Sequence, residues 1–187
     1  MGISEETNLD TGAGESGISG SSVNSPAPLG FTVKTTIERG DAYLSPEIYN
    51  VEITVLEAIR GNAALERLRS QGAGDKSPEA GYEYVLAYVR FGYFQRGRRI
   101  GSEAYELKKG LFVAVSADGQ QEYGIPSNLP QPQPLLTGQI FNNGESHEGW
   151  ILLQVPEEEK EPRLAFKRRH VEGIYGIWGY VWFSLNK

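Results

Sequence analysis

The stretch Tyr-Glu-Tyr-Val-Leu-Ala-Tyr-Val-Arg-Phe, residues 82–91, decides the fold. It is rich in aromatic and β-branched side chains, which favours a strand. Most of its length is apolar on both faces, and a strand that is covered on both sides normally lies in the middle of a sheet. We therefore expect a central strand here, with neighbouring strands on either side.

Two strand patterns precede this segment. Residues 31–38 alternate apolar and polar side chains, which is typical of a half-buried strand. Residues 51–59 alternate in the same way until Leu56, where the break predicts a bulge. Between them and the central strand, residues 62–69 form the one helical pattern, with Asn62 as its cap and Gly72 at its end.

Further short strand patterns follow the central segment, at residues 105–107, 111–115, 150–155, 164–166 and 177–185. Asp118-Gly119 supplies a hairpin turn after the second of these. Residues 120–148 carry four prolines and read as one long loop. Seven or eight short strands with a single short helix predict an all-β, antiparallel β-sandwich over residues 31–187.

Composition limits what this domain can be. The chain has 187 residues, 39% of them hydrophobic, which is enough for one folded core. It contains no cysteine, so a disulfide framework, a thiolate metal site and a cysteine nucleophile are excluded. The formal charge of −6 argues against bulk binding of nucleic acid, whose phosphates need cationic neutralisation.

Residues 1–30 differ from the rest of the sequence. They contain no aromatic residue and no lysine or arginine, and they are rich in serine and glycine. Such a segment buries too little apolar surface to offset the entropy of ordering, so we expect a flexible tail. A tail of this kind fits an export or lipid-anchor signal ahead of Met1, or a solvated cytoplasmic extension.

Several segments follow one another in a specific order: Leu-Glu-Ala-Ile-Arg-Gly at 56–61, Gly-Tyr-Glu-Tyr-Val-Leu-Ala-Tyr-Val at 81–89, Phe-Val-Ala-Val-Ser-Ala-Asp-Gly at 112–119, Gly-Trp-Ile-Leu-Leu-Gln-Val-Pro at 149–156 and Leu-Ala-Phe at 164–166. This order resembles that of the bacterial telokin-like domains of unknown function, which are immunoglobulin-like sandwiches of secreted proteins and lipoproteins. The resemblance covers about residues 51–167. It implies an immunoglobulin-like fold outside the cytoplasm and no shared catalytic residues.

The sequence also departs from that family. Those domains often carry an asparagine just after the central strand, where this chain has Phe91-Gly92. The long proline-rich loop and the aromatic C-terminal strand exceed the usual pattern.

We expect no catalytic residue, no metal site and no cofactor. A Gly-x-Ser-x-Gly elbow is absent, and the nearest arrangement, Ser146 beside His147, reads as part of a polar turn. The two histidines, His147 and His170, lack metal-ligand spacing. A hydrolase that uses residues of the 120–148 loop remains an alternative.

A cluster of cations and aromatics follows the central strand. It consists of Arg90, Phe91, Tyr93, Phe94, Arg96, Arg98 and Arg99, and residues 167–170 could extend it. Stacking aromatics with cations suit single-stranded nucleic acid. The stronger interpretation is a strand end with packed aromatics and solvated arginines. The same arginines could bind an anionic glycan, a lipid headgroup or a protein.

The last strand carries an aromatic stripe. Trp178, Tyr180 and Trp182 share one face, and the other face holds Ile177, Val181, Phe183 and Leu185. Exposed contiguous aromatics are rare in soluble monomers, so burial of the stripe under the proline-rich loop or the helix is favoured. An uncovered stripe would instead form a platform for a sugar or a protein.

These observations favour a non-catalytic binding or accessory domain that is secreted, periplasmic or at the cell surface. A protein partner at the cell envelope is favoured, and a glycan-binding module that uses the aromatic stripe is the first alternative. We expect membrane attachment only through an anchor outside the given sequence. The candidate ligand-binding residues are Trp178, Tyr180, Trp182, Arg96, Arg98 and Arg99.

Overall fold

The computed structural model describes residues 19–39, 47–72, 76–95, 104–124, 130–172 and 175–186. Within these ranges, the side chains of residues 39, 47, 95, 169–172 and 175–178 are not described.

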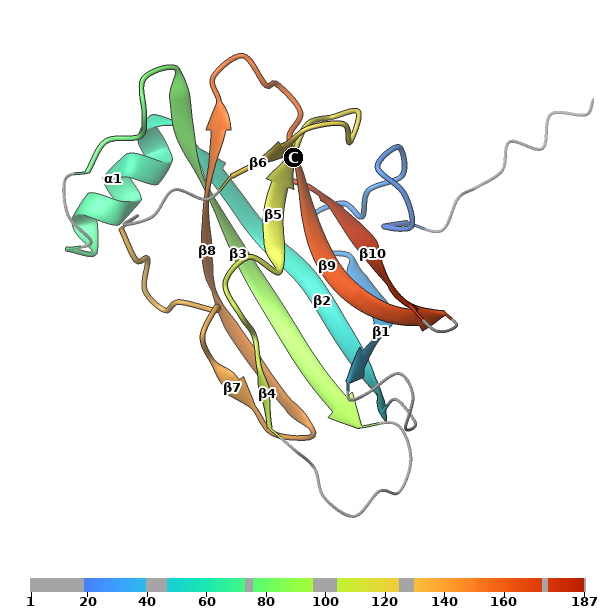
Figure 1. The fold of residues 1–187 in the computed structure, drawn as a ribbon. Helices are drawn as coiled ribbons and strands as arrows, with labels where there is room; N and C mark the ends of the chain where they lie inside the picture. Colours follow the sequence, from blue (N-terminus) through green and yellow to red (C-terminus); the bar gives the residue numbers. More distant parts are fainter. Residues whose placement is uncertain are drawn as a thin grey trace, which may run out of the picture.

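The described residues form two four-stranded antiparallel sheets and a separate strand pair (Figure 1). The first sheet has the order β1 (Thr32–Arg39), β2 (Glu47–Arg60), β3 (Tyr82–Gln95) and β8 (Glu145–Pro156). The second has the order β10 (Tyr175–Ser184), β9 (Arg163–Glu172), β5 (Phe112–Val115) and β6 (Glu122–Tyr123). The strand pair is β4 (Tyr105–Glu106) with β7 (Ile140–Phe141).

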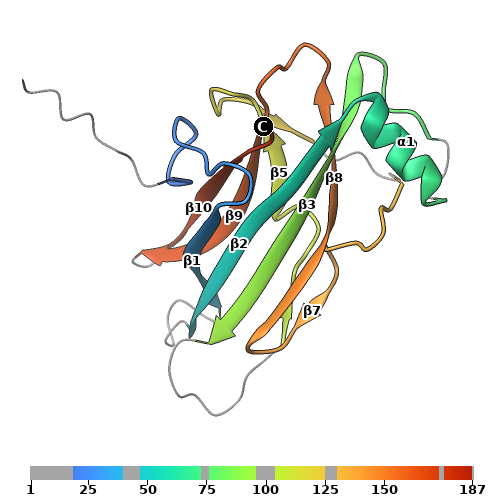
Figure 2. The same ribbon diagram turned by 180° about the vertical axis from the view of Figure 1, so that it is seen from behind.

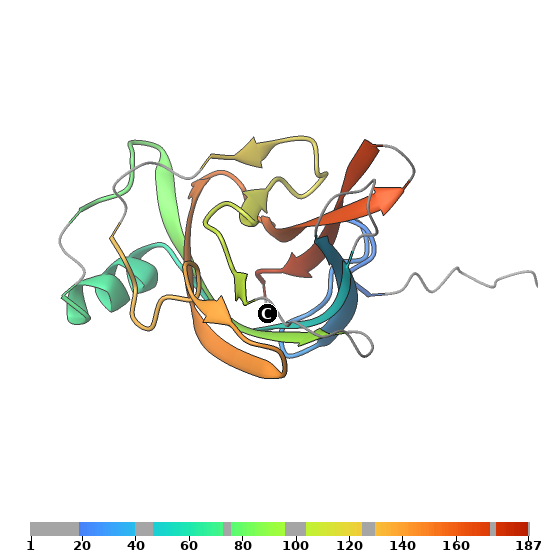
Figure 3. The same ribbon diagram turned by 60° about the horizontal axis from the view of Figure 1, so that its bottom comes forward.

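This architecture confirms the predicted all-β sandwich with one short helix, and the two sheets lie face to face (Figure 3). β3 lies between β2 and β8, as its two apolar faces predicted. The expected bulge in β2 is present, because the β2–β3 register shifts between Val55 and Glu57. The expected hairpin at Asp118-Gly119 joins β5 to β6, with Gly119 at φ +76°.

Phe91 of β3 lies at the centre of the core and is fully buried. Its ring meets rings of the second sheet and of the small strand pair. The centroid distances are 6.0 Å to Tyr105, 6.5 Å to Phe112, 5.1 Å to Phe141 and 5.7 Å to Phe166. The space between the sheets is therefore filled by aromatic packing.

The helix α1 (Asn62–Ser70) packs against the outer face of the first sheet (Figure 2). Its buried residues Ala64 and Leu68 contact the cluster around Trp150. The predicted cap was wrong: Asn62 is the first helical residue, and the cap position belongs to Gly61, with no side-chain hydrogen bond. This cap position has a left-handed φ of +63°, which glycine adopts without steric cost.

The C-terminal boundary of the predicted flexible tail, residues 1–30, was wrong, because residues 19–30 are part of the fold. Residues 19–30 lie beside β10 (Figure 1), and Ala27 is fully buried. The Ala27 amide donates to the Trp182 carbonyl at 2.8 Å, and the Ser184 amide donates to the Ala27 carbonyl at 2.8 Å. Composition did not predict this, because main-chain hydrogen bonds attach the segment and only a few small apolar side chains, such as Ala27 and Leu29, pack on the core. Residues 1–18 of the expected tail lie outside the described residues.

The predicted loop over residues 120–148 contains β6, β7 and the start of β8. A proline-rich piece of it runs along the free edge of β8. The Trp150 amide donates to the Pro134 carbonyl at 2.7 Å, and the Leu136 amide donates to the Trp150 carbonyl at 3.2 Å. This piece therefore covers an edge that would otherwise be open.

Gly149 permits that close approach. A Cβ at this position would lie 2.7 Å from the backbone nitrogen of Leu136 and 2.9 Å from its Cα. Because backbone cannot move aside as a flexible side chain can, we expect Gly149→Ala to lower the free energy of unfolding by about 1–3 kcal/mol. Urea denaturation measures the change. The control is Gly124→Ala, where no atom lies within 4 Å of the new Cβ, and equal effects of the two substitutions would contradict the contact.

Candidate binding surface

The alternation predicted for the C-terminal strand is present in β10. Val181, Phe183 and Leu185 are buried in the core. Tyr180 and Trp182 lie on the outer face of the second sheet, with ring centroids 5.3 Å apart. Trp178 is opposite Arg169 in the β9–β10 register, but its side chain lies outside the description.

Trp182 packs on a small apolar cluster of the same face. The cluster consists of Val113 and Val115 of β5 and Ala165 of β9, all three buried. We call Tyr180, Trp182 and these three residues the β10 aromatic face. Lys167, opposite Tyr180 in the register, borders it, and its Nζ lies 2.6 Å from a carboxylate oxygen of Glu122. The face therefore combines exposed aromatic area with a charged rim.

Burial of the aromatic stripe was expected, and for Tyr180 this expectation was wrong. Tyr180 is 39% exposed, and Trp182 is partly buried. The two elements expected to cover the stripe lie elsewhere: α1 packs on the first sheet, and the proline-rich segment runs along β8. Figures 1 and 2 both place α1 and β10 on opposite sides of the molecule. The β10 aromatic face thus has no secondary-structure element over it among the described residues.

The outer face of the first sheet is covered instead. Trp150 is only 2% exposed. The guanidinium of Arg67, from α1, lies 4.8 Å from the Trp150 ring centroid, and the Tyr88 ring lies at the same distance on the sheet. The large aromatic side chains of this face are therefore used in packing against the helix.

The cation–aromatic cluster does not form a stacking surface in the described residues. Phe91 and Tyr93 are fully buried in the core, and Phe94 is partly buried. Arg90 is paired, with its Nε 2.7 Å from a carboxylate oxygen of Glu148. The bases of a nucleic acid would find no exposed ring at Phe91 or Tyr93. Arg96, Arg98 and Arg99 lie outside the described residues.

Ser146 and His147 are not in a polar turn, because both belong to β8. Consecutive strand residues point to opposite faces, so the hydroxyl and the imidazole cannot form a nucleophile–base pair. His147 instead packs edge-on against Phe141, 4.7 Å between centroids, with its Nε2 3.4 Å from a carboxylate oxygen of Glu145. Hydrogen bonds from Asn142 hold the pKa of the Glu145 carboxyl below its usual range.

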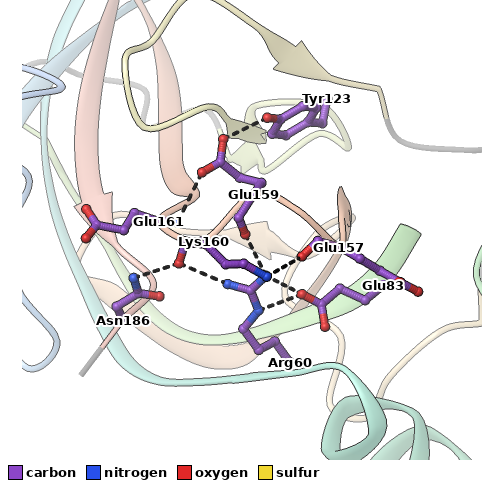
Figure 4. A network of polar contacts seen from close by, with 8 residues as sticks. All are labelled: Arg60, Glu83, Tyr123, Glu157, Glu159, Lys160, Glu161 and Asn186. Carbon is purple, nitrogen blue, oxygen red and sulfur yellow. Dashed lines mark hydrogen bonds and ion pairs between the residues drawn. The ribbon is translucent and has the colours of Figure 1, made fainter. Parts of the chain in front are cut away.

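Sequence reasoning missed a polar network at one end of the sandwich (Figure 4). Arg60, at the end of β2, donates from its Nε to the carboxylate of Glu83 at 2.7 Å and from its Nη2 to the Glu159 carbonyl at 2.7 Å. The Lys160 carbonyl accepts from Arg60 and from the Asn186 side chain, at 3.3 Å and 3.1 Å. Arg60 therefore ties the β8–β9 turn to the first sheet.

Tyr123 joins this network from β6, donating its hydroxyl to the Glu159 carboxylate at 2.9 Å. Burial, together with that carboxylate, raises the pKa of Tyr123 from 10 to about 12. Between these two values the folded state keeps a proton that the unfolded state loses, so stability falls as pH rises through this range.

We expect the titration of Tyr123 to lower the free energy of unfolding of the wild type by on the order of 1–2 kcal/mol between pH 9 and pH 11.5. The measurement is denaturant unfolding at both values. Other groups also titrate there, so the comparison is with Tyr123→Phe, which should lose less stability over the same interval. Identical losses in the two proteins would contradict the raised pKa.

A small cavity opens between β1, β4 and β9. Its volume is about 190 Å³, and it is lined by Ile37, Glu38, Tyr105, Glu106, Lys108, Leu111 and Lys167. Ligand sites for small molecules normally measure about 300–1,000 Å³. This cavity has room for a group no larger than one side chain.

Within the part of the chain that the structure describes, no group of three or more histidine, aspartate or glutamate side chains is placed to hold a metal ion. No helix among the described residues has the length and apolar character to cross a membrane.

Comparison with known proteins gave no relative. No protein family, no curated protein and no solved structure matches the chain.

Proposed function

We propose that the chain is a non-catalytic binding domain that contacts a protein partner through the β10 aromatic face. The observation that carries this proposal is Tyr180, a large aromatic that is 39% exposed beside the partly buried Trp182. Contiguous exposed aromatics are uncommon on soluble proteins and mark interaction surfaces. Tyrosine and tryptophan are also the residues most often found at the energetic centre of protein interfaces.

The surroundings of Tyr180 favour a protein over a glycan. The Tyr180 and Trp182 rings are inclined by 36° and do not form one flat platform. Trp182 also uses part of its surface against Val113, Val115 and Ala165. An apolar centre with a charged rim, here Lys167 with Glu122, is the usual composition of a protein interface.

A location outside the cytoplasm is part of the proposal. It is supported by the serine- and glycine-rich composition of residues 1–30, and by the resemblance to domains of secreted proteins and lipoproteins.

Site-specific photo-crosslinking tests the proposal. A photoreactive amino acid replaces Tyr180 in one protein and Ile48 in a control, since Ile48 is similarly exposed, at 37%, on the first sheet. Each is irradiated with cell-envelope proteins, with and without excess unlabelled wild type. We expect one discrete adduct from position 180 that the wild type competes away, and none from position 48. Equal labelling from both positions would contradict the proposal.

Tryptophan fluorescence distinguishes glycan binding from binding of a protein partner. In a titration with a panel of glycans, the protein-binding proposal predicts no change in emission. A saturable change that Tyr180→Ala abolishes would replace the protein partner with a carbohydrate.

A further inference from the structure

β10 has an outer edge that faces away from β9. The Trp182 amide donates to the Gly20 carbonyl at 3.0 Å, and its carbonyl accepts from Ala27, so the backbone of Trp182 points outward. Backbone direction alternates along an antiparallel strand, so Tyr180 also points its N–H and C=O outward. Lys167, opposite Tyr180 in the register, supports this direction. Its amide donates to the Leu111 carbonyl, on the side of β9 away from β10, so this residue pair exchanges no hydrogen bonds across the two strands.

Residues 19–30 pair with this edge only at Trp182 and Ser184. No backbone hydrogen bond from any described residue reaches the outward side of Tyr180. By the same alternation, Gly176 and Trp178 also direct their backbone groups to this edge. Among the described residues, therefore, β10 has one half that is paired and one half, from Tyr175 to Tyr180, whose outer edge no backbone group pairs.

The open half lacks the usual protection of an edge strand. Proteins guard such edges with charged side chains, prolines or a covering segment. β10, Tyr175–Ser184, contains no charged residue and no proline. Elsewhere the chain does guard its edges: β1 carries Lys34, Glu38 and Arg39, and the segment around Pro134–Leu136 lies along β8. The open half of β10 is thus a template for another strand.

We propose that a second copy of this chain fills the edge, with the two β10 strands antiparallel around a two-fold axis. A two-fold interface requires one surface that is complementary to itself, and two identical open edges satisfy each other. The formal charge of −6 makes two copies repel each other, but pairing through β10 places no like charges directly opposite, because the strand contains no charged residue.

Backbone direction fixes the register. Outward-pointing residues pair with outward-pointing residues, so even-numbered positions face even-numbered positions. Residues 19–30 block pairing at Trp182, which centres the paired stretch on Trp178. Trp178 then lies opposite Trp178 of the second copy, and Tyr180 lies opposite Gly176 of the second copy. The result is one continuous eight-stranded sheet built from two four-stranded sheets.

The absence of cysteine in the chain allows this register to be tested directly. Trp178→Cys places the new thiol opposite its own copy, at a Cα separation of about 5.5 Å that a disulfide can span. Tyr180→Cys alone places its two thiols about 14 Å apart, out of reach. Mild oxidation should therefore cross-link Trp178→Cys alone, and a mixture of Tyr180→Cys with Gly176→Cys as a heterodimer.

Oligomeric state provides the second readout, by light scattering over a concentration series. We expect the wild type to show a doubling of its 20.6 kDa mass. Tyr180→Lys, which adds a charge to the edge without changing the backbone, should return it to monomer while the circular dichroism spectrum stays unchanged. Ser184→Lys, on the half of the edge already paired with Ala27, is the matched control and should remain dimeric.

A wild type that is monomeric at every concentration would overturn the proposal. So would a dimer that cross-links as readily through Tyr180→Cys alone as through Trp178→Cys. Neither experiment needs a partner protein, so failure of the dimer leaves the proposed binding function standing, and the converse holds too.

Discussion

Replacing Phe91 with alanine is expected to lower the free energy of unfolding by about 3–5 kcal/mol, the largest loss among single substitutions considered for this chain. The side chain is fully buried, and it contacts rings contributed by β4, β5, β7 and β9. Rings from several elements cannot all move into the space left by one phenyl group. The cavity therefore remains partly open, and its lining loses dispersion contacts.

Urea denaturation followed by circular dichroism measures the loss. The matched control is Phe31→Ala, because Phe31 is 46% exposed and its removal creates no cavity. We expect the control to change stability by less than about 1 kcal/mol. A similar loss from both substitutions would mean that Phe91 is not at the centre of the core.

Arg60→Ala is expected to lower the free energy of unfolding by about 2–4 kcal/mol. The substitution removes charge-assisted hydrogen bonds from partners that stay partly buried. The Arg60 and Glu83 side chains are 28% and 20% exposed, so both are partly buried. Without the guanidinium, the Glu83 carboxylate and the Glu159 carbonyl both lose their donor.

Arg90→Ala is the matched control. Arg90 makes the same kind of ion pair, to Glu148 at 2.7 Å, but its side chain is 51% exposed. Exposed pairs contribute about 0–1 kcal/mol, so the two substitutions should differ severalfold. Urea unfolding and a double-mutant cycle with Glu83→Gln measure the effect. Equal losses at Arg60 and Arg90 would show that burial does not set the strength of the network.

Local periodicity was sufficient for the main elements of the fold. Two apolar faces placed residues 82–91 in the middle of a sheet, and the broken alternation at Leu56 marked a true bulge. The alternation of β10 also placed Val181 and Phe183 on one face, and the structure buries that face in the core. These features depend on neighbours in the sequence, which the amino-acid order displays directly.

Contacts between distant segments could not be predicted. Arg60 meets Glu159, Lys160 and Glu83 only because three connections converge at one end of the sandwich. The close approach of Leu136 to Gly149 has the same origin. An isolated arginine and an isolated glycine carry no pattern that names their partners.

The exposure of Tyr180 could not be predicted for the same reason, because it depends on which distant segments cover the face. The alternation of β10 is identical whether its outer face is covered or open. Ala64 and Leu68 give α1 an apolar side, but nothing in that pattern selects the first sheet over the second. The covering of one outer face, and with it the candidate binding surface on the other, is decided by tertiary packing.

That asymmetry between the two outer faces is the central claim, and acrylamide quenching of single-tryptophan proteins tests it most directly. One protein keeps only Trp150, which is 2% exposed under α1, and the other keeps only Trp182, on the β10 aromatic face. The remaining tryptophans are replaced with phenylalanine. We expect acrylamide to quench Trp182 severalfold more strongly than Trp150, with Trp150 emitting at the shorter wavelength. Stronger quenching of Trp150 than of Trp182 would contradict the claim.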